Sequence, residues 1–277
     1  MRNLQDKIAI VTGASRGIGR ATALKLAKNG AHIALVARDK SKLSEVAEQV
    51  RALGREALIL PGDVADQDQV IKMVKETLAR WGRVDILVSN AGIYYHSTIF
   101  DLTASLMEKS LQVNFLSHVY AVLAVLPTML EQKDGHIILV SSMAAKRGVP
   151  TDVPYAPAKY ALTGFGEVIR QELFGSGVEV STIMPGRVES DFVEGLEFPW
   201  ATPKMPAEWV SRAIINAIQH RKAEVLVLHF HTRILHYANV VLKEISPRLA
   251  DRIARYLHLE GWKAEAKKGK PYQEDVL

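Results

Sequence analysis

Short apolar runs alternate along this sequence with longer segments in which apolar residues recur every three or four positions. Short runs rich in Val, Ile and Leu are typical of strands buried on both faces, and the longer segments are typical of amphipathic helices. The predicted strands are Ile8–Thr12, His32–Ala37, Ala57–Pro61, Ile86–Ser89, His136–Val140, Glu179–Met184 and Glu224–Leu228. The predicted helices are Gly17–Asn29, Lys40–Leu53, Asp66–Trp81, Thr103–Glu131, Pro154–Leu173 and Pro206–Gln219. This alternation predicts an α/β fold, a doubly wound parallel sheet of about seven strands with helices on both faces.

The composition is that of a folded domain. With 277 residues, of which 48% are hydrophobic and 23% charged, the chain can bury a sizeable core and is not disordered. It contains no cysteine, which excludes a disulfide framework and a thiol-based site. No signal peptide precedes the first strand, and no uninterrupted apolar run reaches the roughly 18 residues of a spanning helix, so we expect a soluble, cytoplasmic protein. The basic residues are dispersed without a recognised nucleic-acid-binding motif, so no nucleic-acid partner is expected.

A glycine-rich turn follows the first predicted strand. Gly13, Gly17 and Gly19 have the spacing Gly-x-x-x-Gly-x-Gly and lead directly into a predicted helix. A strand, a glycine-rich loop and a helix together present unpaired N–H groups and the positive end of the helix dipole to a pyrophosphate. Taken alone, the turn also fits an ordinary connection between a strand and a helix.

A pair of residues with acid-base chemistry lies in the predicted helix Pro154–Leu173. Tyr155 and Lys159 are four residues apart, so a helix places them on one face. A phenol, with an ordinary pKa of about 10, is a poor acid-base catalyst at neutral pH, and a neighbouring ammonium lowers its pKa toward the working range. The same spacing also arises by chance in helices. Pro157 is tolerated there if the helix begins near Pro154, because first-turn donors lack helical partners.

Together these residues resemble the short-chain dehydrogenase/reductase family, from about Leu4 to Val227. The family's marks appear in order as Thr12-Gly13-(x3)-Gly17-x-Gly19, Asp63-Val64, Asn90-Ala91-Gly92, Asn114, Ser142, Tyr155-x-x-x-Lys159 and Pro185-Gly186. The interval from Ser142 to Tyr155 (155 − 142 = 13) is the family's usual one and selects Ser142 over Ser141. The resemblance implies a Rossmann fold and hydride transfer between a nicotinamide cofactor and a carbonyl or alcohol.

The resemblance also implies the role of each catalytic residue. Tyr155 would donate its proton to a carbonyl oxygen while the nicotinamide delivers hydride, and alcohol oxidation would be the reverse. Lys159 would lower the pKa of the tyrosine and hold the nicotinamide ribose. Ser142 would hydrogen-bond the carbonyl oxygen and stabilise its developing charge. Asn114 would hold a proton-relaying water, although a buried, satisfied amide is the alternative. No metal is needed.

The implied cofactor contacts extend over most of the family's marks. They are Gly13, Ser15, Arg16, Gly17, Ile18, Gly19, Arg38, Asp63, Val64, Asn90, Ala91, Gly92, Tyr155, Lys159, Pro185, Gly186, Val188 and Ser190. For Asp63, a turn or cap residue is the alternative.

The charges after the second predicted strand favour NADP(H). An acidic residue there would bind the ribose 2′-hydroxyl of NAD, but Ala37 takes that position. Arg38 follows it and Arg16 lies in the glycine-rich turn, and two guanidiniums suit a 2′-phosphate. Asp39 weakens this prediction slightly, and two solvated surface arginines are the alternative.

The substrate is less defined by the sequence. Residues expected near the pocket are Ile93, Tyr94, Tyr95, His96, Met143, Val149 and the segment Phe192 to Trp200. Their apolar side chains favour a hydrophobic carbonyl or alcohol, or else simply cap the core. A 3-oxoacyl-carrier-protein reductase is an alternative, and so is a nucleotide-binding regulatory protein without turnover. The complete set of catalytic residues favours an enzyme over a silent protein.

A C-terminal extension, residues 229–277, follows the predicted catalytic domain, residues 1–228. It holds nine Lys/Arg and six Asp/Glu, so +3 (9 − 6) of the formal charge of +5 lies here. Apolar residues at helical spacing precede Pro247, and a second amphipathic stretch follows it. Such segments pack on their own domain or on a partner subunit, or lie on an anionic membrane surface.

Two further expectations concern histidines and assembly. His229 and His231 alternate on what we expect to be a strand end, and nothing at recognisable spacing completes a zinc site with them. The predicted helix Thr103–Glu131 carries more apolar residues than one buried face needs. We therefore expect a homodimer paired through this helix and Pro154–Leu173, or a homotetramer if the extension allows it.

Overall fold

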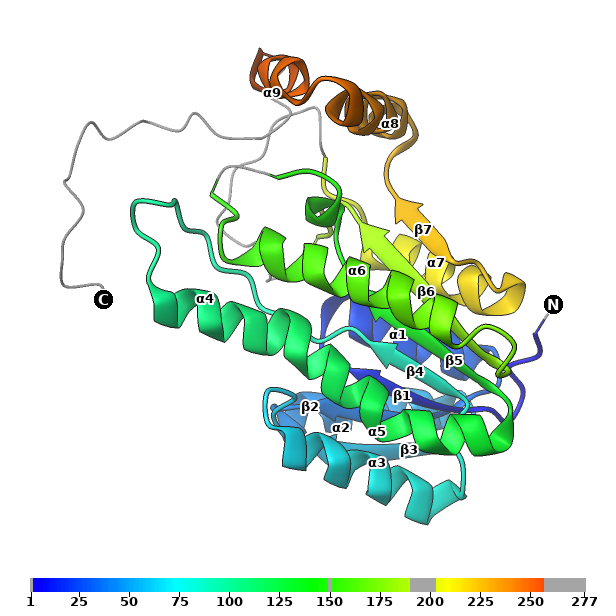
Figure 1. Cartoon of the computed structure of the whole chain (residues 1–277). Helices are drawn as coiled ribbons and strands as arrows, with labels where there is room; N and C mark the ends of the chain where they lie inside the picture. The colour runs from blue at the N-terminus through cyan, green and yellow to red at the C-terminus, as the bar shows by residue number, and fades with distance from the viewer. Residues whose placement is uncertain (1, 149–150, 190–202, 257–277) are drawn as a thin grey trace.

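A seven-stranded parallel sheet forms the centre of the computed structural model, which describes residues 2–148, 151–189 and 203–256 (Figure 1). The strands are β1 (Ile8–Thr12), β2 (His32–Ala37), β3 (Ala57–Pro61), β4 (Ile86–Ser89), β5 (Gly135–Val140), β6 (Val178–Pro185) and β7 (Glu224–Val227). Their order across the sheet is β3-β2-β1-β4-β5-β6-β7. The order reverses direction between β1 and β4, so the loops after these strands meet at the switch point where α/β sheets bind ligands.

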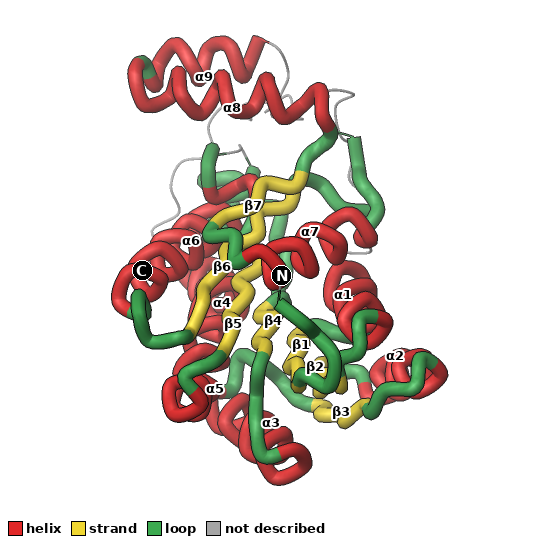
Figure 2. The backbone as a smooth tube through the Cα atoms, turned by 90° about the vertical axis from the view of Figure 1, so that its right-hand side faces the viewer, coloured by secondary structure: helices red, strands yellow, loops and turns green. Residues whose placement is uncertain are grey.

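Helices cover both faces of the sheet, which confirms the doubly wound Rossmann fold (Figure 2). One face carries α1 (Gly17–Lys28), α2 (Lys40–Ala52) and α7 (Ala207–His220). The other carries α3 (Gln67–Trp81), α4 (Ala104–Leu111), α5 (Ser117–Gln132) and α6 (Tyr155–Glu172). Each layer closes over its own apolar cluster, centred on residues such as Leu26 and Leu35 on the first face and Leu87 and Leu139 on the second.

The predicted helix Thr103–Glu131 is present as Ala104–Gln132, but it is not regular along its whole length. The chain forms α4, then a π-helical segment at Gln112–Leu116, then α5. Apolar periodicity does not reveal a single wide turn, because the residues on either side keep helical spacing.

By length and composition alone, Ala104–Gln132 could cross a membrane. It packs against α3, α6 and the sheet, however, as the core helix of a folded domain does.

The start of α6 agrees with the sequence. The helix begins at Tyr155, so Pro157 falls in its first turn, where a missing N–H removes no helical bond. The backbone carbonyl of Asp152 accepts hydrogen bonds from the N–H groups of Tyr155 (3.0 Å) and Ala156 (2.8 Å). These bonds fix the first turn and thereby the direction in which Tyr155 leaves the backbone.

Two helices follow β7: α8 (Phe230–Ile245) and α9 (Pro247–Tyr256), which pack on each other (Figure 1). The break between them precedes Pro247, as expected. The strand-end prediction for His229 and His231 was wrong, because β7 stops at Val227, His229 occupies the N-cap position of α8 without a side-chain capping bond, and His231 lies within α8. In the described ranges, no three His, Asp or Glu side chains gather as metal ligands would.

Candidate active site

The glycine-rich loop between β1 and α1 is closed tightly on itself. Gly13 has a φ of +67°, which favours glycine. A Cβ on Gly19 would lie 2.1 Å from the carbonyl oxygen of Gly13, so only glycine fits there. Arg16 is the N-cap residue of α1 and its side chain makes no capping hydrogen bond to the first turn, whereas Asp39 and Asp66 cap α2 and α3 through their carboxylates. The backbone donors of the first turn of α1 therefore keep the geometry that suits a pyrophosphate.

Thr12 joins this loop to the neighbouring one, a contact that the sequence does not predict. Its hydroxyl accepts hydrogen bonds from the backbone N–H groups of Asn90 (2.8 Å) and Ala91 (3.0 Å). The Asn90 side chain returns a bond to the Thr12 carbonyl at 3.0 Å. The loops after β1 and β4 are thus held side by side at the switch point, which brings together residues predicted to contact the cofactor.

Asn114 sits in the π-helical segment with a fully buried side chain. Its Oδ1 accepts from the N–H of Ile93 at 3.0 Å, and its Nδ2 donates to Ser110 Oγ at 3.0 Å. Ser110 in turn donates to the carbonyl oxygen of Pro154 at 2.6 Å, directly before Tyr155. A Cβ on Gly92 would lie 3.0 Å from Asn114 Oδ1. The amide therefore joins the β4 loop to the start of α6, which is the satisfied amide considered as an alternative.

Lys159 is buried beside the tyrosine, one turn further along α6. Its Nζ donates to the carbonyl oxygen of Val140 at 3.1 Å and lies 5.8 Å from the centroid of the Tyr155 ring. Burial lowers the pKa of Lys159 to about 7. Ser142 Oγ accepts from the N–H of Ala144 at 3.1 Å and also hydrogen-bonds the Tyr155 hydroxyl. Ser142, Tyr155 and Lys159 thus come together as predicted.

The electrostatics of Tyr155 differ from the expectation. Burial raises the pKa of the phenol, a hydrogen bond with Ser142 lowers it by less, and the nearby Asp152 raises it. The pKa is therefore raised, whereas the sequence predicted that Lys159 would lower it. The physical reason is that the ring is desolvated while the lysine ammonium is turned to the Val140 carbonyl. The phenol stays protonated across the neutral range, which is the form that donates a proton.

Three polar side chains beside Tyr155, those of Tyr94, Asp152 and Arg187, were missed as a group, although Tyr94 was predicted near the pocket. The Tyr94 ring lies edge-on to Tyr155, with centroids 5.3 Å apart, and its hydroxyl donates to Asp152. Burial raises the pKa of Asp152, while the Tyr94 bond and the positive charge of Arg187 lower it. Burial lowers the pKa of Arg187 to about 10. No local motif marks this cluster, because its members come from three separate loops.

The residues predicted near the adenosine end lie at the same edge of the sheet. The N–H of Ala14 donates to the Val36 carbonyl at 3.1 Å, so the glycine-rich loop adjoins the end of β2. Arg16 and Arg38, each two residues further on, are both exposed. The Asp39 carboxylate accepts from the N–H of Lys42, which is the cap of α2.

Other predicted contacts have structural roles of their own. Asp63 Oδ1 accepts from the N–H of Ala65 at 2.9 Å, as a turn residue does, and Val64 is buried. Ser15 and Gly17 are partly exposed, and Ile18 packs on the core. Pro185 ends β6, the N–H of Gly186 donates to the Val227 carbonyl, and Val188 is buried. Ser190, Val149 and the segment 192–200 lie outside the described residues.

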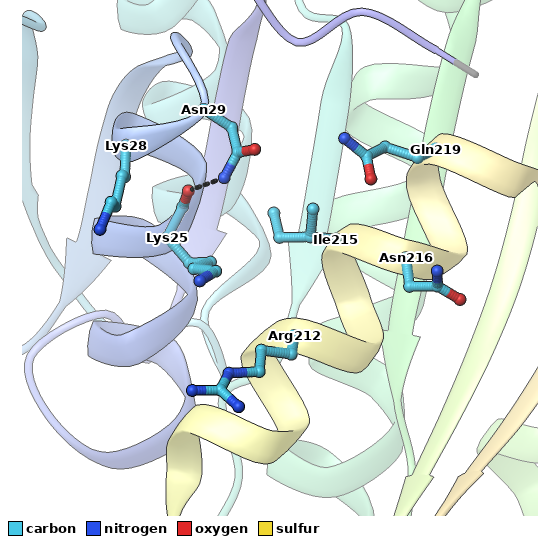
Figure 3. Close-up of a pocket in the computed structure, with 7 residues that line it drawn as sticks. All are labelled: Lys25, Lys28, Asn29, Arg212, Ile215, Asn216 and Gln219. Carbon is cyan, nitrogen blue, oxygen red and sulfur yellow. Dashed lines mark hydrogen bonds between the residues drawn. The ribbon is translucent and has the colours of Figure 1, made fainter.

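A hollow of about 370 Å³ lies between α1 and α7 (Figure 3). It is lined by Lys25, Lys28, Asn29, Arg212, Ile215, Asn216 and Gln219. These residues belong to the last turn of α1 and to α7, whereas the glycine-rich loop is at the opposite end of α1. The hollow therefore contains none of the predicted catalytic residues.

The sequence is similar to those of known proteins. The family described as "short chain dehydrogenase" matches residues 7–197. A ketoacyl reductase, HetN, from Nostoc sp. is 31% identical over 92% of this chain and 91% of its own. A 3-oxoacyl-[acyl-carrier-protein] reductase from Synechocystis sp. is 35% identical over 71% of this chain and 80% of its own.

Solved structures agree with the fold. A metagenomic short-chain oxidoreductase in complex with NADP is 31% identical, has a TM-score of 0.71, and covers 82% of this chain and 98% of its own. A short-chain dehydrogenase/reductase from Burkholderia phymatum in complex with NAD is 24% identical, has a TM-score of 0.81, and covers 90% of this chain and 96% of its own. The family match over most of the chain, with the geometry above, leads to one conclusion: this chain belongs to the short-chain dehydrogenase family of oxidoreductases.

Proposed function

We propose that this protein reduces a carbonyl compound with NADPH. The observation that carries the proposal is the buried phenol of Tyr155, which is protonated at neutral pH and lies beside Ser142 and Lys159. The bound cofactor would supply the hydride. The residues fit such a group, because the glycine-rich loop leaves no room for side chains at Gly19 and the first turn of α1 has no side-chain cap.

The residues divide the work at the carbonyl oxygen. Ser142 orients the oxygen and stabilises its developing negative charge, and Tyr155 donates the proton that completes the alcohol. Lys159, with its pKa lowered to about 7 by burial, exchanges a proton readily near neutral pH and suits the relay that reprotonates the tyrosine. Asn114 positions the first turn of α6 through Ser110 and Pro154.

The choice of NADP(H) rests on the positive charge at the end of β2. Arg16 and Arg38 supply guanidiniums for a 2′-phosphate, and Asp39, whose carboxylate caps α2, is directed to its own helix. The related metagenomic oxidoreductase was solved with NADP and the Burkholderia protein with NAD, so the local charges decide our choice.

Replacing Arg38 with aspartate is expected to reverse the cofactor preference. The carboxylate would repel the 2′-phosphate of NADPH and accept a hydrogen bond from the 2′-hydroxyl of NADH. The ratio of kcat/KM for NADPH to that for NADH should fall about a hundredfold, which corresponds to roughly 2.7 kcal/mol. Arg51→Asp, the same change at the other end of α2, should leave the ratio unchanged. An unaltered ratio in Arg38→Asp would place Arg38 away from the ribose.

The substrate that we propose is a hydrophobic ketone or aldehyde, since Tyr94 and Ala144 pack around the catalytic tyrosine. A 3-oxoacyl thioester is the second candidate, because two relatives are named as ketoacyl and 3-oxoacyl-carrier-protein reductases and Arg187 adds positive charge beside the site. NADPH oxidation against aromatic ketones, aldehydes and 3-oxoacyl thioesters separates the two. No turnover with any carbonyl would favour a silent nucleotide-binding protein.

We infer further that two copies pair through α5 and α6. Leu123 and Leu130 on α5 and Val168 on α6 expose large fractions of their apolar side chains. Light scattering at micromolar concentration should give at least twice the mass of one chain, and Leu123→Glu should lower it. Phe174→Glu, a change at an exposed residue just after α6, should not. A monomeric wild type would refute the pairing.

A further inference from the structure

The outward side of α8 carries a continuous apolar stripe. Four of its members, Ile234, Tyr237, Val241 and Ile245, are spaced three or four residues apart within α8, which places them on one helical face. The fifth is Leu249, which follows the break at Ser246 and lies in α9. All are exposed, Ile245 to 77%. We call these five residues the outer stripe. Exposed apolar side chains gathered in this way mark an interaction site more often than scattered ones do.

The opposite side of α8 is held against the catalytic domain. Lys243 Nζ donates to the Tyr160 hydroxyl at 2.9 Å and lies 5.2 Å from the centroid of that ring. It also reaches the carbonyl oxygen of Lys146 at 3.4 Å. Lys243 is two positions from both Val241 and Ile245, about 200° around the helix. The outer stripe therefore faces away from the catalytic domain, and α8 does not have to rotate or detach for these residues to contact another surface.

Positive charge accompanies the outer stripe. Arg233, Arg248 and Arg252 are exposed on the same two helices. The Arg233 guanidinium lies 5.8 Å from the centroid of the Tyr237 ring. Glu244 and Asp251 offset part of this charge, but the segment 229–277 as a whole carries +3 (9 − 6). An aromatic ring next to an arginine is an arrangement suited to the boundary between headgroups and acyl chains.

We propose that the outer stripe binds the protein to the surface of an anionic membrane, with α8 lying parallel to the bilayer plane. A helix of this kind needs only a narrow apolar face and neighbouring cations, since the acyl boundary supplies the rest of the contact. The outer stripe is narrow and has exposed arginines near it, and a helix that lies in the headgroup region uses both at once. Its shape and charge therefore fit a lipid surface better than a second subunit.

The test is cosedimentation of the full chain with vesicles. Vesicles of equal parts phosphatidylcholine and phosphatidylglycerol should bind the protein, and phosphatidylcholine alone should bind it much more weakly. Val241→Glu with Ile245→Glu should abolish binding. Arg248→Glu with Arg252→Glu should lower the partition coefficient for anionic vesicles by about tenfold or more, because each cation near an anionic surface contributes to binding. Phe174→Glu is the matched control and should bind like the wild type.

Two further measurements make the outcome decisive. Circular dichroism and the reduction of a water-soluble ketone should be unchanged in every variant, which shows that the fold is intact. Light scattering in the absence of vesicles should give the same mass for the wild type and the stripe variant. No binding of the wild type to anionic vesicles would overturn the proposal. A lower mass for the stripe variant would also overturn it and identify the outer stripe as a subunit contact.

Discussion

Tyr155→Phe is expected to lower kcat about a thousandfold while leaving NADPH binding almost unchanged. The substitution removes only the hydroxyl, and loss of a general acid of this kind typically costs 10² to 10⁴ in rate. The ring would keep its edge-on contact with Tyr94 and its place in the small apolar cluster with Ala156. Single-turnover kinetics with a saturating ketone, together with NADPH titration by fluorescence, measure the two quantities separately.

The matched control is Tyr160→Phe, five residues further along the same helix. Its hydroxyl accepts a bond from Lys243 and is not directed at the catalytic residues, so the rate should stay near that of the wild type. A Tyr155→Phe variant that retains most of the activity would remove the tyrosine from the mechanism. A variant that loses both turnover and NADPH binding would show that the hydroxyl is needed to bind the cofactor and is not only a proton donor.

Gly19→Ala is expected to weaken NADPH binding about 10- to 100-fold and to lower the free energy of unfolding by about 1–3 kcal/mol. The new methyl group would meet the Gly13 carbonyl oxygen at 2.1 Å and the Asn90 amide nitrogen at 2.8 Å. The first of these is backbone and cannot rotate away, so the loop itself must move. The displaced backbone would carry the phosphate-facing N–H groups with it. Calorimetric titration with NADPH and thermal unfolding measure the two effects.

Gly164→Ala supplies the control for this change. Gly164 lies inside α6, and a Cβ there would meet nothing within 4 Å. Alanine is the better helix former by about 1 kcal/mol, so this variant should be slightly more stable and bind NADPH normally. Normal NADPH affinity in Gly19→Ala would mean that the glycine-rich loop does not contact the cofactor.

The parts of the fold that depend on local pattern were predictable from the sequence. Buried strands such as Ile8–Thr12 and His32–Ala37 were predicted with their observed ends, because apolar runs bounded by glycine or charge leave little freedom. The histidines after β7 were misplaced because the apolar run continues past Val227 to Leu228, whereas hydrogen bonding to β6 stops at Val227. The end of a strand is determined by where its hydrogen bonds to the adjacent strand stop, and this pairing cannot be read from the sequence.

The candidate site was likewise predictable where it depends on local spacing, and not where it depends on packing between distant segments. The motif that contains Ser142, Tyr155 and Lys159 could be recognised, because it is defined by the intervals between these residues in the sequence. The proximity of Asp152 to Tyr94 depends on the packing of two loops 58 positions apart, and no pattern in either loop reveals it. The pKa of Tyr155 was predicted in the wrong direction for a related reason. Helical spacing shows that a lysine is near, but burial and the lysine's own hydrogen bond determine the balance.

Because of the π-helical segment, the geometry of this site depends on how many residues the segment contains, as well as on which residues they are. Its wide turn accommodates one residue more than an α-helix would, and each residue of an α-helix advances the chain by about 100°. Deleting one position between Gln112 and Leu116 would restore a regular helix and change the directions in which the side chains of this segment leave the helix axis. Asn114 could then no longer hold Ile93 and Ser110 together, even with every named side chain still present. A one-residue deletion in this segment would therefore disrupt the site as much as a substitution of Asn114 would.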